Sequence, residues 1–420
     1  MPLSLSSIVA TTLTASNIVS GLPPLKGRFP GLDSTSSIDS PGLKNFHSIK
    51  EIRATHANQD GQAALAKIYE KYRVRVPQDL DSALARRRKR DTFSTPLQYT
   101  TQDVAQISAK VGVSQEKVNL ILDTSSSGVW LLSEEAVNSE FQKPYVPEKS
   151  FSAERMEGYT WEMEHLNGRT AFGDVYQDMV SIDTVGYSLT SYNQAVQLAI
   201  AASRFWNLKD VSGVMGMAFS SRNAITPEPQ PNFFDNVVEK LDEKVFTVDM
   251  KHLATGAVEF GHVDSNKYAG NIGYTEVFNQ DGYWNFTLGG LINDATSPFS
   301  GVEYAIADTS SSLMLLPMQY NMAYYKQISD SEYSSKHGGF IFPCDTTMPD
   351  FAFVVGDVEL VIPGSYIEFS VLDDDSDLCF GGLQPSDNLG LNIVGSIAFN
   401  SAFVVFRPID AKIGWATKSL

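Results

Sequence analysis

Two aspartates occupy the same local sequence at widely separated places in the chain. Asp123 lies in Leu122-Asp123-Thr124-Ser125-Ser126, and Asp308 lies in Ala307-Asp308-Thr309-Ser310-Ser311, 185 residues later. Each frame follows an apolar run and is followed later by two apolar residues and a glycine, at Gly216 and Gly395, so the sequence contains an internal repeat. One Asp-Thr-Ser is an ordinary turn sequence. Two copies in matching apolar frames predict two homologous lobes that each contribute one buried carboxylate.

Two buried carboxylates that face each other can share one proton. Like charges about 3 Å apart cannot both ionise cheaply, so one group stays a base while its partner stays an acid. Such a pair can activate a water molecule and protonate a leaving group without a metal ion or a covalent intermediate. The chain has only two cysteines and six histidines without H-E-x-x-H spacing, so we expect neither a metal site nor a cofactor.

Composition and charge limit the remaining function classes. The 420 residues are 43% hydrophobic, and no apolar run approaches the roughly 18 residues that a membrane-spanning helix needs. Residues 1–90 carry 14 basic against 7 acidic side chains, whereas the rest carries 18 against 42. This contrast predicts a basic leader that is attracted to an acidic body and is released more easily at low pH. Nucleic acid is excluded as a partner of the acidic body.

The segments that must position the carboxylates differ in composition and in predicted secondary structure before and after residue 90. Residues 1–20 are a candidate signal peptide, residues 21–45 form a Pro/Gly/Ser-rich linker, and apolar spacing predicts a helix over 63–72. The run Arg86–Arg90 has two interpretations: a processing-protease site in an exposed linker, or a solvated basic run or nuclear address. Beyond Asp91, short Val/Ile/Tyr/Phe/Thr-rich runs between turn residues predict a mainly β body.

Nearly the whole chain resembles the pepsin family of aspartic endopeptidases, in particular its fungal penicillopepsin-like members. Besides the two aspartate frames, the similar stretches are 158–161, 216–220 and 260–268. The resemblance implies a mainly β, bilobal pepsin-like fold with two homologous lobes and an interlobe cleft, preceded by a propeptide. Its implied divisions are a propeptide at 21–90, an N-terminal lobe at 91–242 with a flap at 160–172, an interlobe segment at 243–265, and a C-terminal lobe at 266–420.

The resemblance also implies roles for residues around the cleft. Asp123 and Asp308 would be the catalytic pair of an acid-acting endopeptidase, made as a zymogen, that takes an extended polypeptide substrate and works as a monomer. Thr124 and Thr309 would form the buried hydrogen bonds that hold the two lobes together there. The other residues that would support the pair are Ser125, Ser126, Ser310 and Ser311.

Further roles implied by the resemblance lie outside the pair. Lys71, in preference to Lys67, would sit on the carboxylates and block them, and maturation would follow cleavage after Arg90. Cys344 and Cys379 match the family's disulfide of the C-terminal lobe; two unpaired buried thiols are the alternative. Disulfide, leader and basic site together suggest a secreted or vacuolar protein. Asn285-Phe286-Thr287 is a weak glycosylation signal, because it lies in a strand-like run.

The chain departs from the family at its reacting centre. Serine replaces the family's glycine at Ser125 and Ser310; its hydroxyl could hydrogen-bond an aspartate and lower the pKa of the pair, or crowd the catalytic water. At the flap tip, His165, Asn167 and Gly168 stand in place of the family's Tyr-Gly-Asp-Gly-Ser. His165 either acts beside Trp130 and the pair or belongs to a hairpin tip that has drifted.

These departures keep two alternatives to a peptidase open. One is a pepsin-like protein repurposed for binding, or for acid/base chemistry on a small molecule, for example in a biosynthetic pathway. The other is a serine hydrolase that uses the run Ser125-Ser126-Ser127, which lacks a G-x-S-x-G elbow.

Overall fold

The computed structural model describes most of the body of the chain and part of its leader. The described residues are 47–50, 60–90, 105–113, 117–137, 142–164, 170–183, 188–202, 210–252, 254–292, 298–299, 302–372 and 375–420. All of them belong to one compact unit, Lys44–Leu420. The candidate signal peptide at 1–20 and the flap residues His165, Asn167 and Gly168 lie outside the described residues.

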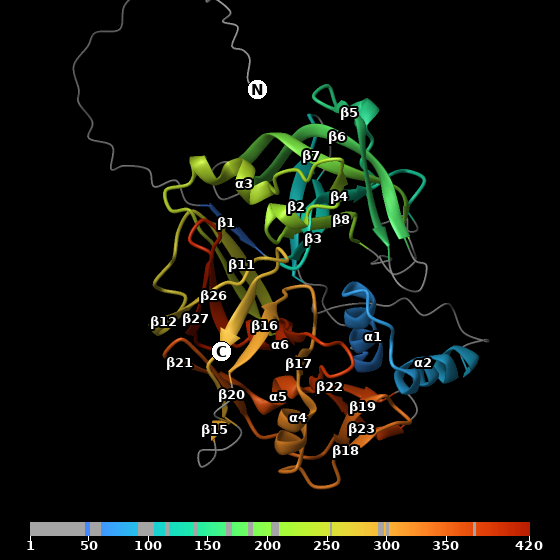
Figure 1. Ribbon diagram of the computed structural model, residues 1–420, viewed down its shortest axis with the longest axis vertical. Helices are drawn as coiled ribbons and strands as arrows, with labels where there is room; N and C mark the ends of the chain where they lie inside the picture. The colour runs from blue at the N-terminus through green and yellow to red at the C-terminus, as the bar shows by residue number, and fades with distance from the viewer. Residues whose placement is uncertain are drawn as a thin grey trace, which may run out of the picture. The chain divides into compact units, whose positions relative to one another are not determined.

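The first aspartate frame belongs to an eight-stranded sheet, drawn mostly in cyan and green in Figure 1, with the strand order β2-β3-β8-β4-β7-β6-β5-β9. The long strands β5 to β7 lie in the part of the chain where Val/Ile/Tyr/Phe/Thr-rich runs predict a β body. The strand bounds are β2 Gln106–Val111, β3 Lys117–Asp123, β4 Ser127–Leu132, β5 Glu154–Glu164, β6 Thr170–Asp183, β7 Ser188–Ala202, β8 Gly213–Met217 and β9 Ile225–Thr226.

The second frame belongs to a five-stranded sheet with the order β13-β16-β25-β17-β24. In the first sheet β8 pairs parallel with β3 and antiparallel with β4, and in the second β25 pairs parallel with β16 and antiparallel with β17. The sequence repeat therefore reappears as a structural repeat. The bounds are β13 Asn285–Leu288, β16 Glu303–Ala307, β17 Met314–Leu316, β24 Leu383–Pro385 and β25 Asn392–Val394.

A six-stranded antiparallel sheet, with the order β1-β11-β10-β26-β27-β12, combines strands from the leader and from the body. Residues 47–50 of the leader pair with β11, in the register His47↔Phe260 to Lys50↔Ala257. No sequence pattern at 47–50 predicted this strand. The bounds are β1 His47–Lys50, β10 Phe246–Lys251, β11 Ala254–Phe260, β12 Ala269–Glu276, β26 Ala402–Arg407 and β27 Lys412–Thr417.

Two four-stranded sheets, with the orders β15-β14-β20-β21 and β18-β19-β23-β22, complete the C-terminal part. Cys344, just after β19, forms a disulfide with Cys379 of β23, so the bridge joins neighbouring strands. The bounds are β14 Gly290–Ile292, β15 Pro298–Phe299, β18 Glu332–Ser334, β19 Gly339–Pro343, β20 Phe351–Val355, β21 Val358–Ile362, β22 Glu368–Leu372 and β23 Asp375–Gly381.

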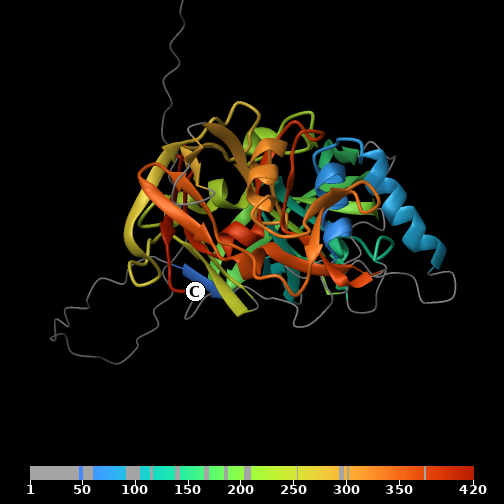
Figure 2. The same ribbon diagram turned by 90° about the horizontal axis from the view of Figure 1, so that it is seen from below.

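Two helices of the leader pack against the body, blue in Figures 1 and 2. The first, α1 (Gly61–Lys71), contains the predicted apolar periodicity, and the Asp60 carboxylate caps its N-terminus by accepting from Ala63 N. The second, α2 (Gln78–Arg90), begins just after Pro77. The other helices are α3 Phe233–Val237, α4 Met318–Tyr325, α5 Gly364–Ile367 and α6 Ser396–Phe399.

The prediction that Arg86–Arg90 lies in an exposed linker is wrong, because these residues end α2. Arginine, alanine and leucine are good helix formers, and the helix interior has neither glycine nor proline. Asp79 and Asp81 in the first turn also match the helix dipole. A basic run that looks like a linker by composition is therefore helical.

Candidate active site

Each aspartate lies at the end of a buried strand beside a glycine of the repeat. Asp123 ends β3 opposite Gly216 of β8, and Asp308 directly follows β16, where its backbone N–H donates to Val394 O at 3.0 Å. The Asp123 and Asp308 side chains are 3% and 0% exposed. A carboxylate that is buried this deeply needs hydrogen-bond donors or a charge partner, so its neighbours determine what it can do.

The glycines allow two backbone segments to approach each other closely behind the aspartates. A Cβ at Gly216 would lie 2.6 Å from Ser126 O, and one at Gly395 would overlap the carbonyl oxygens of Leu313 and Ser311. Real Cβ atoms do not approach backbone at these distances, so any side chain here would push the aspartate loops away from their strands. Glycine is therefore required at the same place in both halves of the repeat.

Two threonines connect the aspartate loops across the junction of the two halves. The hydroxyl of Thr124 donates to Ala307 O at 2.8 Å, and the hydroxyl of Thr309 donates to Leu122 O at 2.7 Å. Each hydroxyl also accepts from the backbone N–H of the other threonine, at 3.0 and 3.2 Å. Both residues are fully buried, so each loop fixes the position of the other.

The serines that follow each threonine surround the carboxylates with donors. The backbone N–H and the hydroxyl of Ser125 both donate to Asp123 Oδ1 at 2.9 Å, and Ser310 donates to Asp308 Oδ1 at 3.0 and 3.2 Å. Ser126 and Ser311 donate to the Oδ2 atoms of Asp123 and Asp308, at 2.7 and 2.5 Å. Each aspartate thus receives three donors from its own loop.

Replacing the family's glycine by serine causes no backbone strain. Ser125 and Ser310 are not among the described residues with positive φ, so the cost expected for a side chain in the left-handed region does not arise. The hydroxyls point at the carboxylates. Between the two interpretations of this substitution, the contacts favour donation to an aspartate.

Lys71, at the end of α1, contacts both aspartates. Its Nζ lies 3.1 Å from Asp123 Oδ1 and 2.7 and 2.8 Å from the two oxygens of Asp308, and it also donates to Ser310 Oγ. A single ammonium group within these distances of both carboxylates places the carboxylates side by side. Lys67 lies one turn earlier on the same helix, and the charges of Asp123 and Asp308 act on it as well.

Burial and neighbouring charges shift the pKa values of Asp123, Lys71 and Lys67. Burial disfavours the charge on Asp123, but Lys71 and the hydrogen bonds from Ser126 and Ser125 outweigh it and hold the pKa of this carboxyl below its usual range. Burial likewise opposes the charge on Lys71, and the two carboxylates raise its pKa above the ordinary value. The pKa of Lys67 is lowered to about 8 by burial and by the charge of Lys71.

Tyr72, the residue after Lys71, was missing from the sequence-based candidates. Its hydroxyl donates to Asp308 Oδ2 at 2.9 Å, and its ring lies 5.6 Å from the ring of Tyr283. Burial and the charge of Asp308 raise the pKa of this tyrosine well above its ordinary value. Its position next to Lys71, at the C-terminal cap of α1, was the available signal, although neighbours in a helix need not point to the same site.

A small cavity of about 60 Å³ remains at the carboxylates beside the leader. Residues of both halves line it, including Asp123, Trp130, Arg222 and Tyr283. The ring of Trp130 lies 6.0 Å from that of Trp161. No short motif in the sequence pointed to Arg222 or Tyr283.

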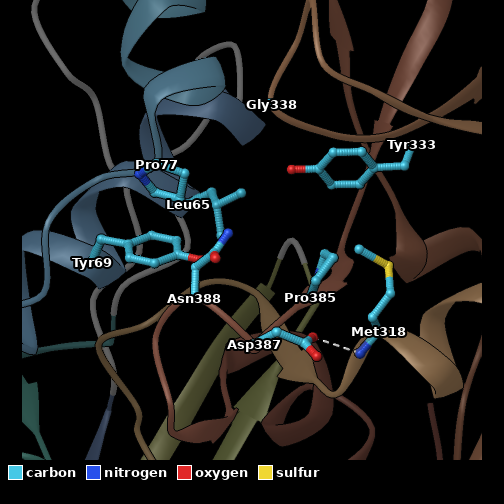
Figure 3. A pocket seen from close by; sticks show the side chains of 9 residues that line it. All are labelled: Leu65, Tyr69, Pro77, Met318, Tyr333, Gly338, Pro385, Asp387 and Asn388. Atoms are coloured by element: carbon cyan, nitrogen blue, oxygen red, sulfur yellow. Dashed lines mark hydrogen bonds between the residues drawn. The ribbon is translucent and has the colours of Figure 1, made fainter.

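A larger cavity of about 220 Å³ lies between the leader and the C-terminal half (Figure 3). Leu65, Tyr69 and Pro77 of the leader line one side, and the Asp387 carboxylate on the other accepts from Met318 N at 2.7 Å. The catalytic candidates do not line it. Within the described ranges, no group of three or more His, Cys, Asp or Glu side chains is arranged to hold a metal ion.

The close backbone approach at Gly216 generates a stability prediction. We expect Gly216→Ala to lower the free energy of unfolding by about 1–3 kcal/mol, because the added methyl group overlaps Ser126 O. Urea unfolding followed by tryptophan fluorescence would measure the change. Gly289→Ala is the matched control, since its Cβ would meet nothing closer than 3.7 Å. Equal midpoints for the two variants would contradict the prediction.

Comparison with known proteins agrees with this geometry. The family model described as eukaryotic aspartyl protease matches residues 104–418. Endothiapepsin of Cryphonectria parasitica is 36% identical over 384 residues, which cover 89% of this chain and 90% of the relative. Aspergillopepsin-1 of Aspergillus fumigatus is 34% identical over 418 residues, which cover 99% of both chains. Podosporapepsin of Podospora anserina is 35% identical over 391 residues, covering 89% of this chain and 91% of the relative.

These matches extend over both aspartate frames and both halves of the repeat, and they confirm the resemblance inferred from the motifs. The alternatives outside proteolysis are not favoured, because the relatives carry the names of aspartic proteases over nearly the full chain. The chain belongs to the eukaryotic aspartyl protease family.

Proposed function

We propose that Asp123 and Asp308 are the catalytic pair of an acid-acting aspartic endopeptidase that is made as a zymogen. The observation that carries the proposal is the Lys71 ammonium, which contacts both carboxylates from a segment outside the family match. A cation that contacts both aspartates and fills the space between them keeps water and substrate away. Removing it would leave two adjacent carboxylates with their loop donors in place.

In the mature enzyme the pair divides the work of acid and base. With one proton shared between them, the ionised carboxylate removes a proton from a water molecule, whose oxygen attacks the peptide carbonyl. The protonated carboxyl gives its proton to the carbonyl oxygen, so a neutral tetrahedral diol forms. On collapse, the carboxyl that took the proton of water gives it to the amine nitrogen, the other carboxylate takes a proton from the diol, and the C–N bond breaks. Ser126 and Ser311 would hold the Oδ2 atoms in place throughout.

The proposed organisation follows the sequence-based divisions: propeptide 21–90, N-terminal lobe 91–242, interlobe segment 243–265 and C-terminal lobe 266–420. Strands β10 and β11 support an interlobe role, since they join a sheet with β26 and β27 from the chain's end. Maturation would follow cleavage after Arg90. Because α2 is helical up to this residue, its last turn would have to unwind to enter a processing protease as an extended strand.

We propose an extended polypeptide as substrate, a monomer as the working form, and a secreted or vacuolar location. The disulfide supports this compartment, because disulfides persist in oxidising environments. None of the described helices combines the length and apolar character needed to cross a bilayer. Asn285 is partly exposed on β13, and its glycosylation stays a prediction.

Asp123→Asn tests the catalytic proposal. We expect the matured wild-type protein to cut a denatured protein at acidic pH and the variant to lose at least about 10³-fold in kcat/KM, because an amide cannot act as the base. Asp387→Asn is the matched control, because it makes the same change at a carboxylate of the larger cavity, away from the catalytic pair. It should cut like the wild type. Undiminished cleavage by Asp123→Asn, or none by folded wild-type protein, would overturn the proposal.

Lys71→Met tests the zymogen proposal. The lowered pKa of Asp123 means that its ion pair with Lys71 is fully present above the ordinary value of 3.8 and is lost as the pH falls through the lower value in the folded chain. The raised pKa of Lys71 keeps the pair intact well above neutral pH. The wild-type zymogen should therefore stay latent near pH 6 and activate only in acid.

We expect uncleaved Lys71→Met to cut a peptide near pH 6, where the uncleaved wild type is silent. Lys67→Met is the matched control on the same helix and should stay latent. Mass spectrometry would establish that each sample still carries its leader. A latent Lys71→Met zymogen would show that other contacts block the site.

The double variant Ser125→Gly, Ser310→Gly tests the role of the two hydroxyls. Donation to an ionised carboxylate lowers its pKa, so loss of the hydroxyls should raise the pKa of the catalytic base. Activity disappears as the pH falls through that pKa. The acid limb of the kcat/KM profile should thus move upward by about 0.5–1 pH unit. An unmoved or lowered acid limb would contradict this role.

A further inference from the structure

Arg222 brings a positive charge to the cavity at the catalytic carboxylates. It ends the short 3₁₀ turn Ser220–Arg222 that follows β8, in the N-terminal half of the repeat. Its guanidinium carbon lies 3.6 Å from the centroid of the Tyr283 ring, which belongs to the C-terminal half. Nη1 donates to Asp281 O at 3.0 Å, and the aliphatic part of the side chain packs against Gly282. The plane of the guanidinium is therefore fixed.

The donors of this guanidinium are mostly unused within the described part of the chain. Arg222 forms no salt bridge with a described carboxylate, and its Nε is buried without a hydrogen-bond partner there. A guanidinium has five N–H donors, and burying a donor without an acceptor costs free energy. An arginine that is held rigidly and left without an acidic partner is well placed to bind an anion from outside.

The leader marks the space that this anion would enter. Arg222 and Tyr283 line the same cavity as Asp123 and Ser125, and the leader's Tyr72 ring lies against Tyr283. When the leader departs, the space beside the Tyr283–Arg222 pair opens next to the carboxylates. Side chains on one face of an extended peptide recur every second residue, so a peptide lying across the pair of aspartates would direct one of them here.

We propose that Arg222 is a specificity-determining residue that selects substrates with a glutamate or aspartate at one position close to the bond that is cut. The inference rests on the proposed endopeptidase function. A planar guanidinium binds a carboxylate through two parallel hydrogen bonds, and Tyr283 holds the plane in place. The body's 42 acidic side chains against 18 basic ones disfavour acidic peptides elsewhere, so a local cation is needed to accept them.

A set of peptides tests this selection on the wild-type enzyme. One neutral peptide that the matured enzyme cuts would be resynthesised with Glu or with Gln at each position near the cleaved bond. We expect one position at which Glu raises kcat/KM about ten-fold over Gln at pH 5.5. The ratio should fall toward one below about pH 4, because the glutamate of the substrate then protonates.

Variants assign the selection to Arg222. Arg222→Met removes the charge and keeps the aliphatic stem, and it should reduce the Glu/Gln ratio to about one while the neutral peptide is still cut. Arg222→Lys keeps the charge without the planar fork, so its ratio should lie between those of Arg222→Met and the wild type. Lys240→Met is the matched control, since Lys240 Nζ lies over the Tyr192 ring at 4.7 Å in another cation–π contact. Its ratio should equal that of the wild type.

The outcomes separate this proposal from the endopeptidase proposal. Cleavage of the neutral peptide that requires Asp123, with equal rates for Glu and Gln at every position, would overturn the role of Arg222 alone. A Glu preference that persists in Arg222→Met would also overturn it. If Arg222→Met does not fold, the wild-type Glu/Gln scan and Arg222→Lys decide. Absence of all cleavage by folded, matured wild-type protein would instead overturn the proposed function.

Discussion

The repulsion between two buried carboxylates is the constraint on which the rest of the structure depends. Asp123 and Asp308 lie close enough for one ammonium to contact both, in a setting that is almost closed to water. Ionised side by side, they would destabilise the folded chain. Three donors for each carboxylate, the reciprocal threonine hydrogen bonds and a lysine from the leader all offset that cost. In the mature enzyme the same repulsion would keep one proton between them.

Sequence alone predicted the parts of this arrangement that depend on local patterns. The repeated Asp-Thr-Ser frames located both aspartates. The matching glycines predicted two similar halves, which appear in the structure as β3-β8-β4 and β16-β25-β17. Local patterns could not reveal β1, because four residues become a strand only through pairing with β11. Composition also misassigned Arg86–Arg90, since a run of basic residues suits a linker and a helix equally. Arg222 and Tyr283 are 61 positions apart in the sequence and contact each other only in the folded chain, so no local pattern could reveal the pair.

Serine in place of the family's glycine shows how the aspartate loops accommodate an added side chain. The backbone at Ser125 and Ser310 has an ordinary conformation, so the family's glycine is not needed there for its φ. The added hydroxyls lie within hydrogen-bond distance of the Oδ1 atoms. By contrast, Gly216 and Gly395 have no room for a side chain, and they are retained. Space for a side chain, rather than distance from the reacting atoms, separates the glycines that changed from those that did not.

Two of the places at which the leader contacts the body are well separated: β1 on the edge of the six-stranded sheet and α1 at the carboxylates. Two contacts joined by a short segment make the leader a bivalent ligand. When one contact dissociates, the other holds the dissociated part at a high effective concentration near its own site. Cutting the chain after residue 90 severs the covalent link but leaves both contacts intact. Proteolysis and release are therefore distinct events, and a nicked leader would dissociate fully only when both contacts open within the same interval.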